Sequence, residues 1–206
     1  GKKKPPIRRN SGKWDRAMIQ MRDKVALSSP KSRLYTQTEL CLKEYALAKP
    51  KTYMEMLRDG PPMRYRWPLW KNLVDLSQFY IPGLYERLCK LSSPWESDIR
   101  KDTHRTFPTE PYFASEKYEH IGQQQLFHVL KAISLYFPNL GYVQSMNFLA
   151  GLLLIVSGGN ELEAFWTFVI LLRDCRFLMM GFFEREFPLL EFYIHVYYEI
   201  LAVEMP

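Results

Sequence analysis

Residues 121–172 read IGQQQLFHVLKAISLYFPNLGYVQSMNFLAGLLLIVSGGNELEAFWTFVILL and carry the strongest helical pattern of this 206-residue chain. In the first part of the stretch, apolar residues recur at helical spacing at Ile121, Leu126, Val129, Leu130 and Ile133. The breakers and caps that follow predict one helix that ends at Pro138, a second that follows Gly141 and runs to Gly158-Gly159, and a third that Asn160 caps.

Helix signals continue towards the N-terminus. Ser93-Pro94-Trp95-Glu96 combines a Ser N-cap, a Pro at the first helical position and a Glu that closes a capping box, so a helix is predicted up to Arg105. Shorter helices are predicted at 17–25, 40–48 and 52–58. Because no strand-like alternation and no internal repeat occurs, the predicted fold class is all-α.

The last segment, Phe187 to Val203, is apolar almost all round. Its polar residues Glu191, His195 and Glu199 follow one another at four-residue intervals and form a narrow stripe. The stripe could ligate a metal, but the favoured interpretation is a helix inside a bundle with one solvated edge. No metal site is therefore predicted.

Charge divides the chain into two parts. Residues 1–50 contain 13 Lys and Arg against 4 Asp and Glu, whereas residues 51–206 contain 15 against 18. We predict a basic N-terminal flank with one or two short helices at 1–50 and a helical domain at 51–206. The run GKKKPPIRRNSGK is either a solubilising linker or a contact for an adaptor or an anionic membrane. No nucleic-acid partner is expected, because the body is acidic and lacks a recognition signature.

Several features of the sequence favour an intracellular location. No apolar core follows the N-terminal basic residues, so no signal peptide is predicted. The longest apolar run, Phe148 to Val156, is too short to cross a membrane. The 3 cysteines lie far apart without CxxC spacing, which is typical of reduced thiols. Nucleotide-binding glycine motifs, a P-loop and a GxSxG elbow are all missing from the sequence.

Two short constellations have a chemical interpretation. Ile99, Asp102 and Arg105 are three residues apart and share one side of a helix, where Asp102 can pair with Arg105. The alternative is an ordinary surface ion pair. Tyr142 and Gln144 precede an apolar helix, so Gln144 could project into a cleft. The alternative is a polar residue in the first helical turn.

Taken in order, these residues resemble the TBC domain of Rab GTPase-activating proteins. Ile99, Asp102 and Arg105 match its IxxDxxR motif, and Tyr142 and Gln144 match its YxQ motif. The stretch Gly60–Trp70 is similar to the opening motif of the family, with its arginine at Arg64 or Arg66. The Glu163-Ala164-Phe165-Trp166 segment also matches. Ser145 departs from the pattern, which usually has glycine there.

The resemblance implies an irregular multi-helix TBC-type domain, of which this chain is expected to be the N-terminal, finger-bearing portion. It implies that Arg105 and Gln144 are catalytic fingers, that Ile99, Asp102 and Tyr142 support them, and that Gly60, Arg64 and Trp70 are structural. The implied partner is a GTP-bound Rab, which brings its own GTP and Mg²⁺, so no cofactor is expected in this chain.

The implied function is acceleration of GTP hydrolysis by a Rab in vesicle trafficking. The expected location is the cytoplasm, with peripheral contact to endomembranes. The alternative is a catalytically silent TBC module that binds a GTPase or acts as a scaffold. The presence of both Arg105 and Gln144 favours the active form.

Overall fold

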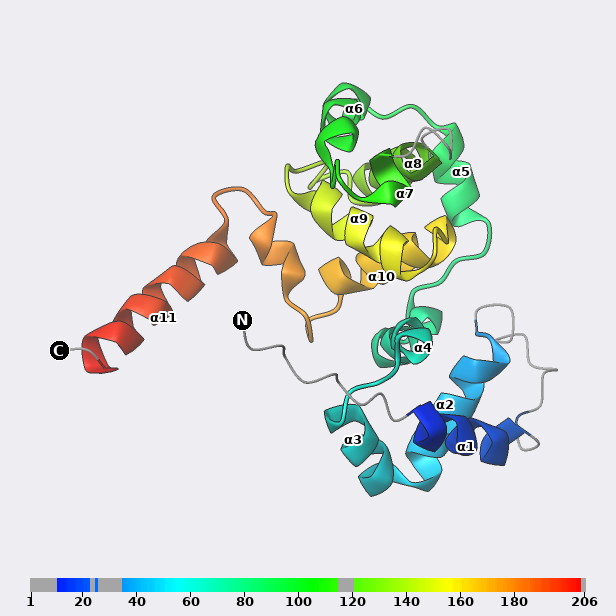
Figure 1. The fold of residues 1–206 in the computed structure, drawn as a ribbon. Helices are drawn as coiled ribbons and strands as arrows, with labels where there is room; N and C mark the ends of the chain where they lie inside the picture. Colours follow the sequence, from blue (N-terminus) through cyan, green and yellow to red (C-terminus); the bar gives the residue numbers. More distant parts are fainter. Residues whose placement is uncertain (1–10, 23–24, 26–34, 115–120, 205–206) are drawn as a thin grey trace. The chain divides into compact units, whose positions relative to one another are not determined.

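The computed structural model describes residues 11–22, 25, 35–114 and 121–204. Its helices are α1 Ser11–Arg22, α2 Gln37–Ala48, α3 Pro50–Arg58, α4 Met63–Val74, η2 Leu76–Gln78, α5 Leu84–Lys90, α6 Glu96–Arg105, α7 Pro111–Ala114, α8 Ile121–Tyr136, α9 Met146–Val156, α10 Glu161–Arg173, η4 Met179–Phe182 and α11 Pro188–Glu204 (Figure 1). No strand occurs among these residues, so the predicted all-α class is confirmed.

The chain forms two compact units, Gly1–Gln78 and Phe79–Pro206. In the first unit, α2 packs on α1, α3 and α4, and the rings of Trp14 and Tyr65 stack at 5.7 Å in the core. The predicted boundary after Pro50 falls at the start of α3, within this unit. The basic residues 1–10 of the predicted flank and residues 23–24 of the helix predicted at 17–25 lie outside the described residues.

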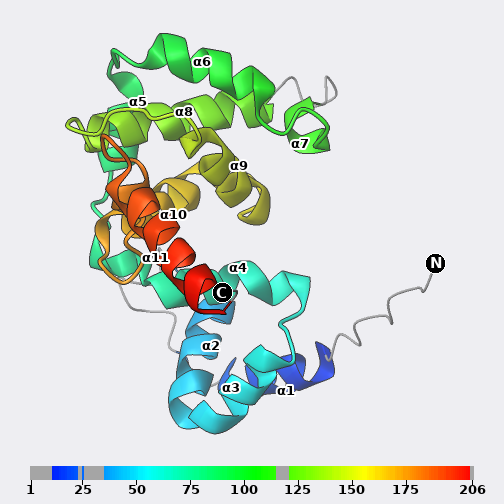
Figure 2. The same cartoon turned by 90° about the vertical axis from the view of Figure 1, so that its left-hand side faces the viewer.

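In the second unit, α8 is the central helix and lies between α6 on one side and α9 and α10 on the other (Figure 2). It also packs against α5 and α7. Most of the apolar residues that predicted this helix are fully buried, namely Leu126, Val129, Leu130 and Ile133. Their burial on several sides explains why α8 organises the unit.

The predicted starts of α6 and α9 both precede the observed ones. Helix α6 begins at Glu96, two residues after the predicted first position Pro94, but the predicted capping-box bond is present, since Glu96 Oε1 accepts from the Ser93 N–H at 3.1 Å. Helix α9 begins at Met146 and not directly after Gly141, because Ser145 has a φ angle of +84°. A right-handed helix cannot include such left-handed residues. The predicted cap of α10 is confirmed, since Asn160 Oδ1 accepts from the Glu163 N–H at 3.1 Å.

The prediction for the last helix is wrong in one respect. Helix α11 forms, but none of its described residues is buried, although Phe182 of η4 stacks on Tyr193 at 5.8 Å. An apolar sequence predicts burial only where neighbouring elements cover it, and here Phe192 and Ile194 stay about half exposed. Across the part of the chain that is described, no cluster of potential metal ligands is found, and no helix has the length and hydropathy to cross a bilayer.

Candidate functional site

The candidate site begins with the last turn of α6. The Arg105 guanidinium forms an ion pair with Asp102 Oδ1, and the two side chains are 59% and 5% exposed. Asp102 is thus a buried carboxylate that supports an exposed arginine, and the pair is not the ordinary surface ion pair considered from sequence. Ile99, one turn earlier on the same side, is fully buried and anchors α6 in the core.

The connection between α8 and α9 supplies the second part of the site. The Tyr142 hydroxyl donates to Asp102 Oδ2 at 2.5 Å, and both side chains are buried. Burial and this hydrogen bond raise the pKa of the Tyr142 phenol well above its ordinary value. The hydrogen bond of the Tyr142 hydroxyl ties the connection to α6.

Gln144 is exposed and lies in a turn before α9, so it is not a residue of the first helical turn. Tyr142 and Met146 on either side of it are buried. Gln144 therefore projects from a short segment that is anchored at both ends, on the connection whose Tyr142 contacts the arginine-bearing helix.

Gly141 holds this connection close to the other end of α6. A Cβ atom added at Gly141 would lie 2.5 Å from the Trp95 indole, and the φ angle of +68° also disfavours any residue with a side chain. Trp95 is the residue just before α6. The connection thus contacts α6 at both ends of the helix, through Trp95 and through Asp102.

A Ser145→Gly substitution is expected to stabilise the protein. Serine at φ +84° is strained by about 1–2 kcal/mol, of which the entropy of a glycine in the unfolded chain cancels about half. We expect the melting temperature to rise by about 2–3 °C in a thermal melt. Ser157→Gly is the control, because Ser157 follows the other end of α9 with φ −81° and should lose stability. Equal shifts for both variants would contradict the strain at Ser145.

A Tyr142→Phe substitution is expected to destabilise the protein by about 1–3 kcal/mol, because a buried oxygen of Asp102 loses its donor. Urea unfolding measures this free energy. Tyr197→Phe is the control, because Tyr197 is 59% exposed in the same unit. If the free energy of unfolding falls equally in both variants, the buried hydrogen bond of the Tyr142 hydroxyl does not stabilise the protein.

The residues predicted from the opening motif lie in the first unit. Gly60 follows α3, Arg64 on α4 forms an ion pair with Asp15, and Arg66 Nε donates to the Pro61 carbonyl at 3.3 Å. Trp70 is 39% exposed and meets Trp67 edge-on at 6.4 Å between ring centres. All the contacts of these residues named here lie within the first unit.

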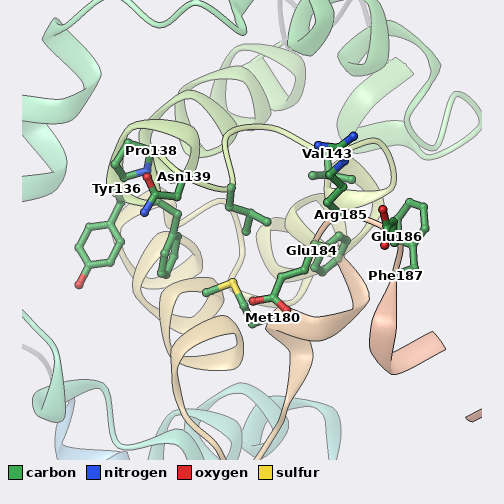
Figure 3. Close-up of a pocket in the computed structure, with 12 residues that line it drawn as sticks. Tyr136, Pro138, Asn139, Val143, Met180, Glu184, Arg185, Glu186 and Phe187 are labelled. Carbon is green, nitrogen blue, oxygen red and sulfur yellow. The ribbon is translucent and has the colours of Figure 1, made fainter. Parts of the chain in front are cut away.

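A cavity of about 690 Å³ lies beside the α8–α9 connection (Figure 3). Apolar side chains line much of it, and Val143, the neighbour of Gln144, takes part. The labelled charged residues Glu184, Arg185 and Glu186 come from the segment before α11. Arg105 and Gln144 are not among the lining residues, so the two exposed side chains lie outside this pocket.

Two buried polar residues at the site have no role in the sequence predictions. Thr106 and Asn147 are each 1% exposed and hydrogen-bond to each other. The available signal was an amide within the otherwise apolar sequence of α9, since buried polar groups are found where they have partners.

Residues 63–206 match the family model described as Rab-GTPase-TBC domain. Ecotropic viral integration site 5 protein homolog of Homo sapiens is 38% identical over 128 residues, which cover 62% of this chain and 15% of that protein. Rab GTPase-activating protein eat-17 of Caenorhabditis elegans is 34% identical over 128 residues, with 62% and 14% covered. A crystal structure of the Chlamydomonas flagellar RabGAP TBC domain aligns with a TM-score of 0.54 and 25% identity, and covers 84% of this chain and 56% of that one.

Proposed function

Because the chain belongs to the Rab-GTPase-TBC domain family, we propose that it accelerates GTP hydrolysis by a GTP-bound Rab. The observation that carries this proposal is the pair of exposed side chains, Arg105 and Gln144, on segments joined by the buried Tyr142–Asp102 hydrogen bond. The similarity to eat-17, which is named a Rab GTPase-activating protein, supports the same activity.

Arg105 is the proposed arginine finger. Hydrolysis of GTP spreads negative charge over the γ-phosphate oxygens, and a guanidinium presents a permanent positive charge with several donors in one plane. The ion pair with Asp102 limits the directions in which the guanidinium can point. An arginine side chain that is already held in position loses less conformational entropy when it contacts the phosphate.

Gln144 is the proposed glutamine finger. Its carboxamide has both an acceptor and donors, so it can orient the attacking water and contact the partner at once. GTP and Mg²⁺ come with the Rab in this proposal, and this chain supplies two side chains to a site that the partner otherwise completes. The place of action is proposed to be the cytoplasmic surface of endomembranes, with the basic flank as an additional contact.

The test is single-turnover GTP hydrolysis across a panel of GTP-loaded Rabs. Wild-type protein is expected to accelerate hydrolysis by at least one Rab in proportion to its concentration. If it accelerates none and still binds a GTP-loaded Rab, the catalytic proposal fails and the silent GTPase-binding module is correct. If it neither accelerates nor binds any Rab, both interpretations fail.

A further inference from the structure

Asn147 forms a second buried connection between the two finger segments. Its Oδ1 accepts from the Ser145 N–H at 3.2 Å, and its Nδ2 donates to Thr106 Oγ1 at 2.7 Å. Thr106 Oγ1 in turn donates to the Asp102 carbonyl at 2.7 Å. The Thr106 hydroxyl thus donates one hydrogen bond and accepts another. We name this chain of bonds from Ser145 to Asp102 the Asn147 bridge.

The Asn147 bridge joins the residues that directly follow each finger. Thr106 comes after Arg105, and Ser145 comes after Gln144. The Tyr142–Asp102 hydrogen bond joins residues that precede the fingers. The two finger segments are therefore connected on both sides of the functional residues. Two separate connections fix an orientation, whereas a single one leaves a rotation free.

Helix packing supports the same arrangement. A Cβ atom added at Gly151 of α9 would lie 3.1 Å from both Thr106 Cγ2 and Phe107 Cε2, so a larger residue there would require these side chains to shift by a few tenths of an ångström. The ring of Phe107 also meets Phe148 at 5.6 Å. Helix α9 is thus in direct contact with the residues that end the arginine-bearing segment.

The chemistry of Asn147 argues for a positioning role. Burying an amide in an apolar helix costs free energy unless its hydrogen bonds are made, and a leucine or methionine would fill the space without that cost. In Asn147 both halves of the amide bond to finger segments. The amide therefore contributes geometry that an apolar side chain cannot provide.

From these contacts we propose that Asn147 and Thr106 are positioning residues that hold the two fingers at a fixed separation and orientation for transition-state stabilisation. The inference rests on the proposed function of the same site. Both fingers must meet one γ-phosphate at the same time, and a displacement of about 1 Å can lower a rate by about 10²-fold. Loss of the bridge should therefore lower kcat and leave the KM for GTP-bound Rab nearly unchanged.

The test compares Thr106→Val, which loses the hydroxyl and keeps the shape, with Thr106→Ser, which keeps the hydroxyl. For Rab-stimulated hydrolysis we expect kcat to fall about 10- to 100-fold in Thr106→Val, with KM within about threefold, and to stay near wild type in Thr106→Ser. Thr167→Val is the control. Thr167 is a buried threonine of α10 whose hydroxyl has no hydrogen-bond partner among the described residues.

Asn147→Ala breaks the bridge from the other side and guards against a folding defect in one variant. The double variant Thr106→Val, Asn147→Ala should lose no more than the larger single effect, because both changes remove the same connection. Thermal melts and the affinity for GTP-loaded Rab report the folded state of each variant. A KM effect alone, a wild-type kcat in folded Thr106→Val, or fully additive losses would each overturn the inference. A wild-type protein that accelerates no Rab would instead refute the proposed function.

Discussion

Arg105→Ala is expected to lower Rab-stimulated GTP hydrolysis by about 10³–10⁵-fold, equivalent to about 4–7 kcal/mol of transition-state stabilisation. The Arg105 side chain is 59% exposed, but its removal also takes the ion-pair partner from the buried Asp102, so a loss of stability of the kind expected for Tyr142→Phe accompanies it. A thermal melt therefore establishes that the variant is folded at the assay temperature. The measurement is single-turnover hydrolysis with the Rab that responds best to the wild-type protein.

Arg105→Lys sharpens this prediction. Lysine keeps the positive charge but lacks the planar fork that can contact Asp102 and a phosphate together. The rate of stimulated hydrolysis should therefore fall nearly as far in Arg105→Lys as in Arg105→Ala. Arg87→Ala is the matched control, because Arg87 is also an exposed arginine in the last turn of a helix of the same unit. Acceleration that survives in Arg105→Ala, or that falls equally in Arg87→Ala, would show that Arg105 is not the finger.

Gln144→Ala has the second largest expected effect, a loss of about 10²–10³-fold in kcat. The carboxamide is proposed to orient the attacking water, and the substitution removes this preorganised group. The neighbouring Tyr142 and Asn147 keep the segment in place through their buried hydrogen bonds, so the melting temperature should not change.

The control for Gln144→Ala is Gln124→Ala, an exposed glutamine of α8 in the same unit. It should retain the full rate. A Gln144→Ala protein that binds GTP-loaded Rab and hydrolyses GTP at the wild-type rate would exclude the glutamine finger while leaving the arginine prediction standing.

Local chemistry allowed part of the fold to be predicted. The apolar face of α8 and the Asn160 cap depend on residues within a few positions of each other, and both were confirmed. The start of α9 depends on the left-handed conformation of Ser145, which serine adopts rarely, so local preference pointed to an earlier start. The burial of α11 depends on neighbours, which its own sequence does not describe.

The candidate site, too, could be predicted from sequence only where its contacts are local. The Asp102–Arg105 ion pair is a contact within one helix and was predicted from spacing alone. The burial of Asp102 and its bond to Tyr142, 40 positions away, arise from tertiary packing. Asn147 was visible in the sequence only as a polar residue in an apolar segment, and its partner Thr106 has no local signal.

The two connections between the finger segments have a consequence for folding kinetics. The Tyr142–Asp102 and Asn147–Thr106 bonds span 40 and 41 positions of the chain. The entropy lost on closing a loop grows only with the logarithm of its length, and a second closure of nearly the same loop adds little to the first. Once α6 meets the α8–α9 connection, both bonds are therefore expected to form in one cooperative event, so that a partly assembled site is not a populated stage of folding.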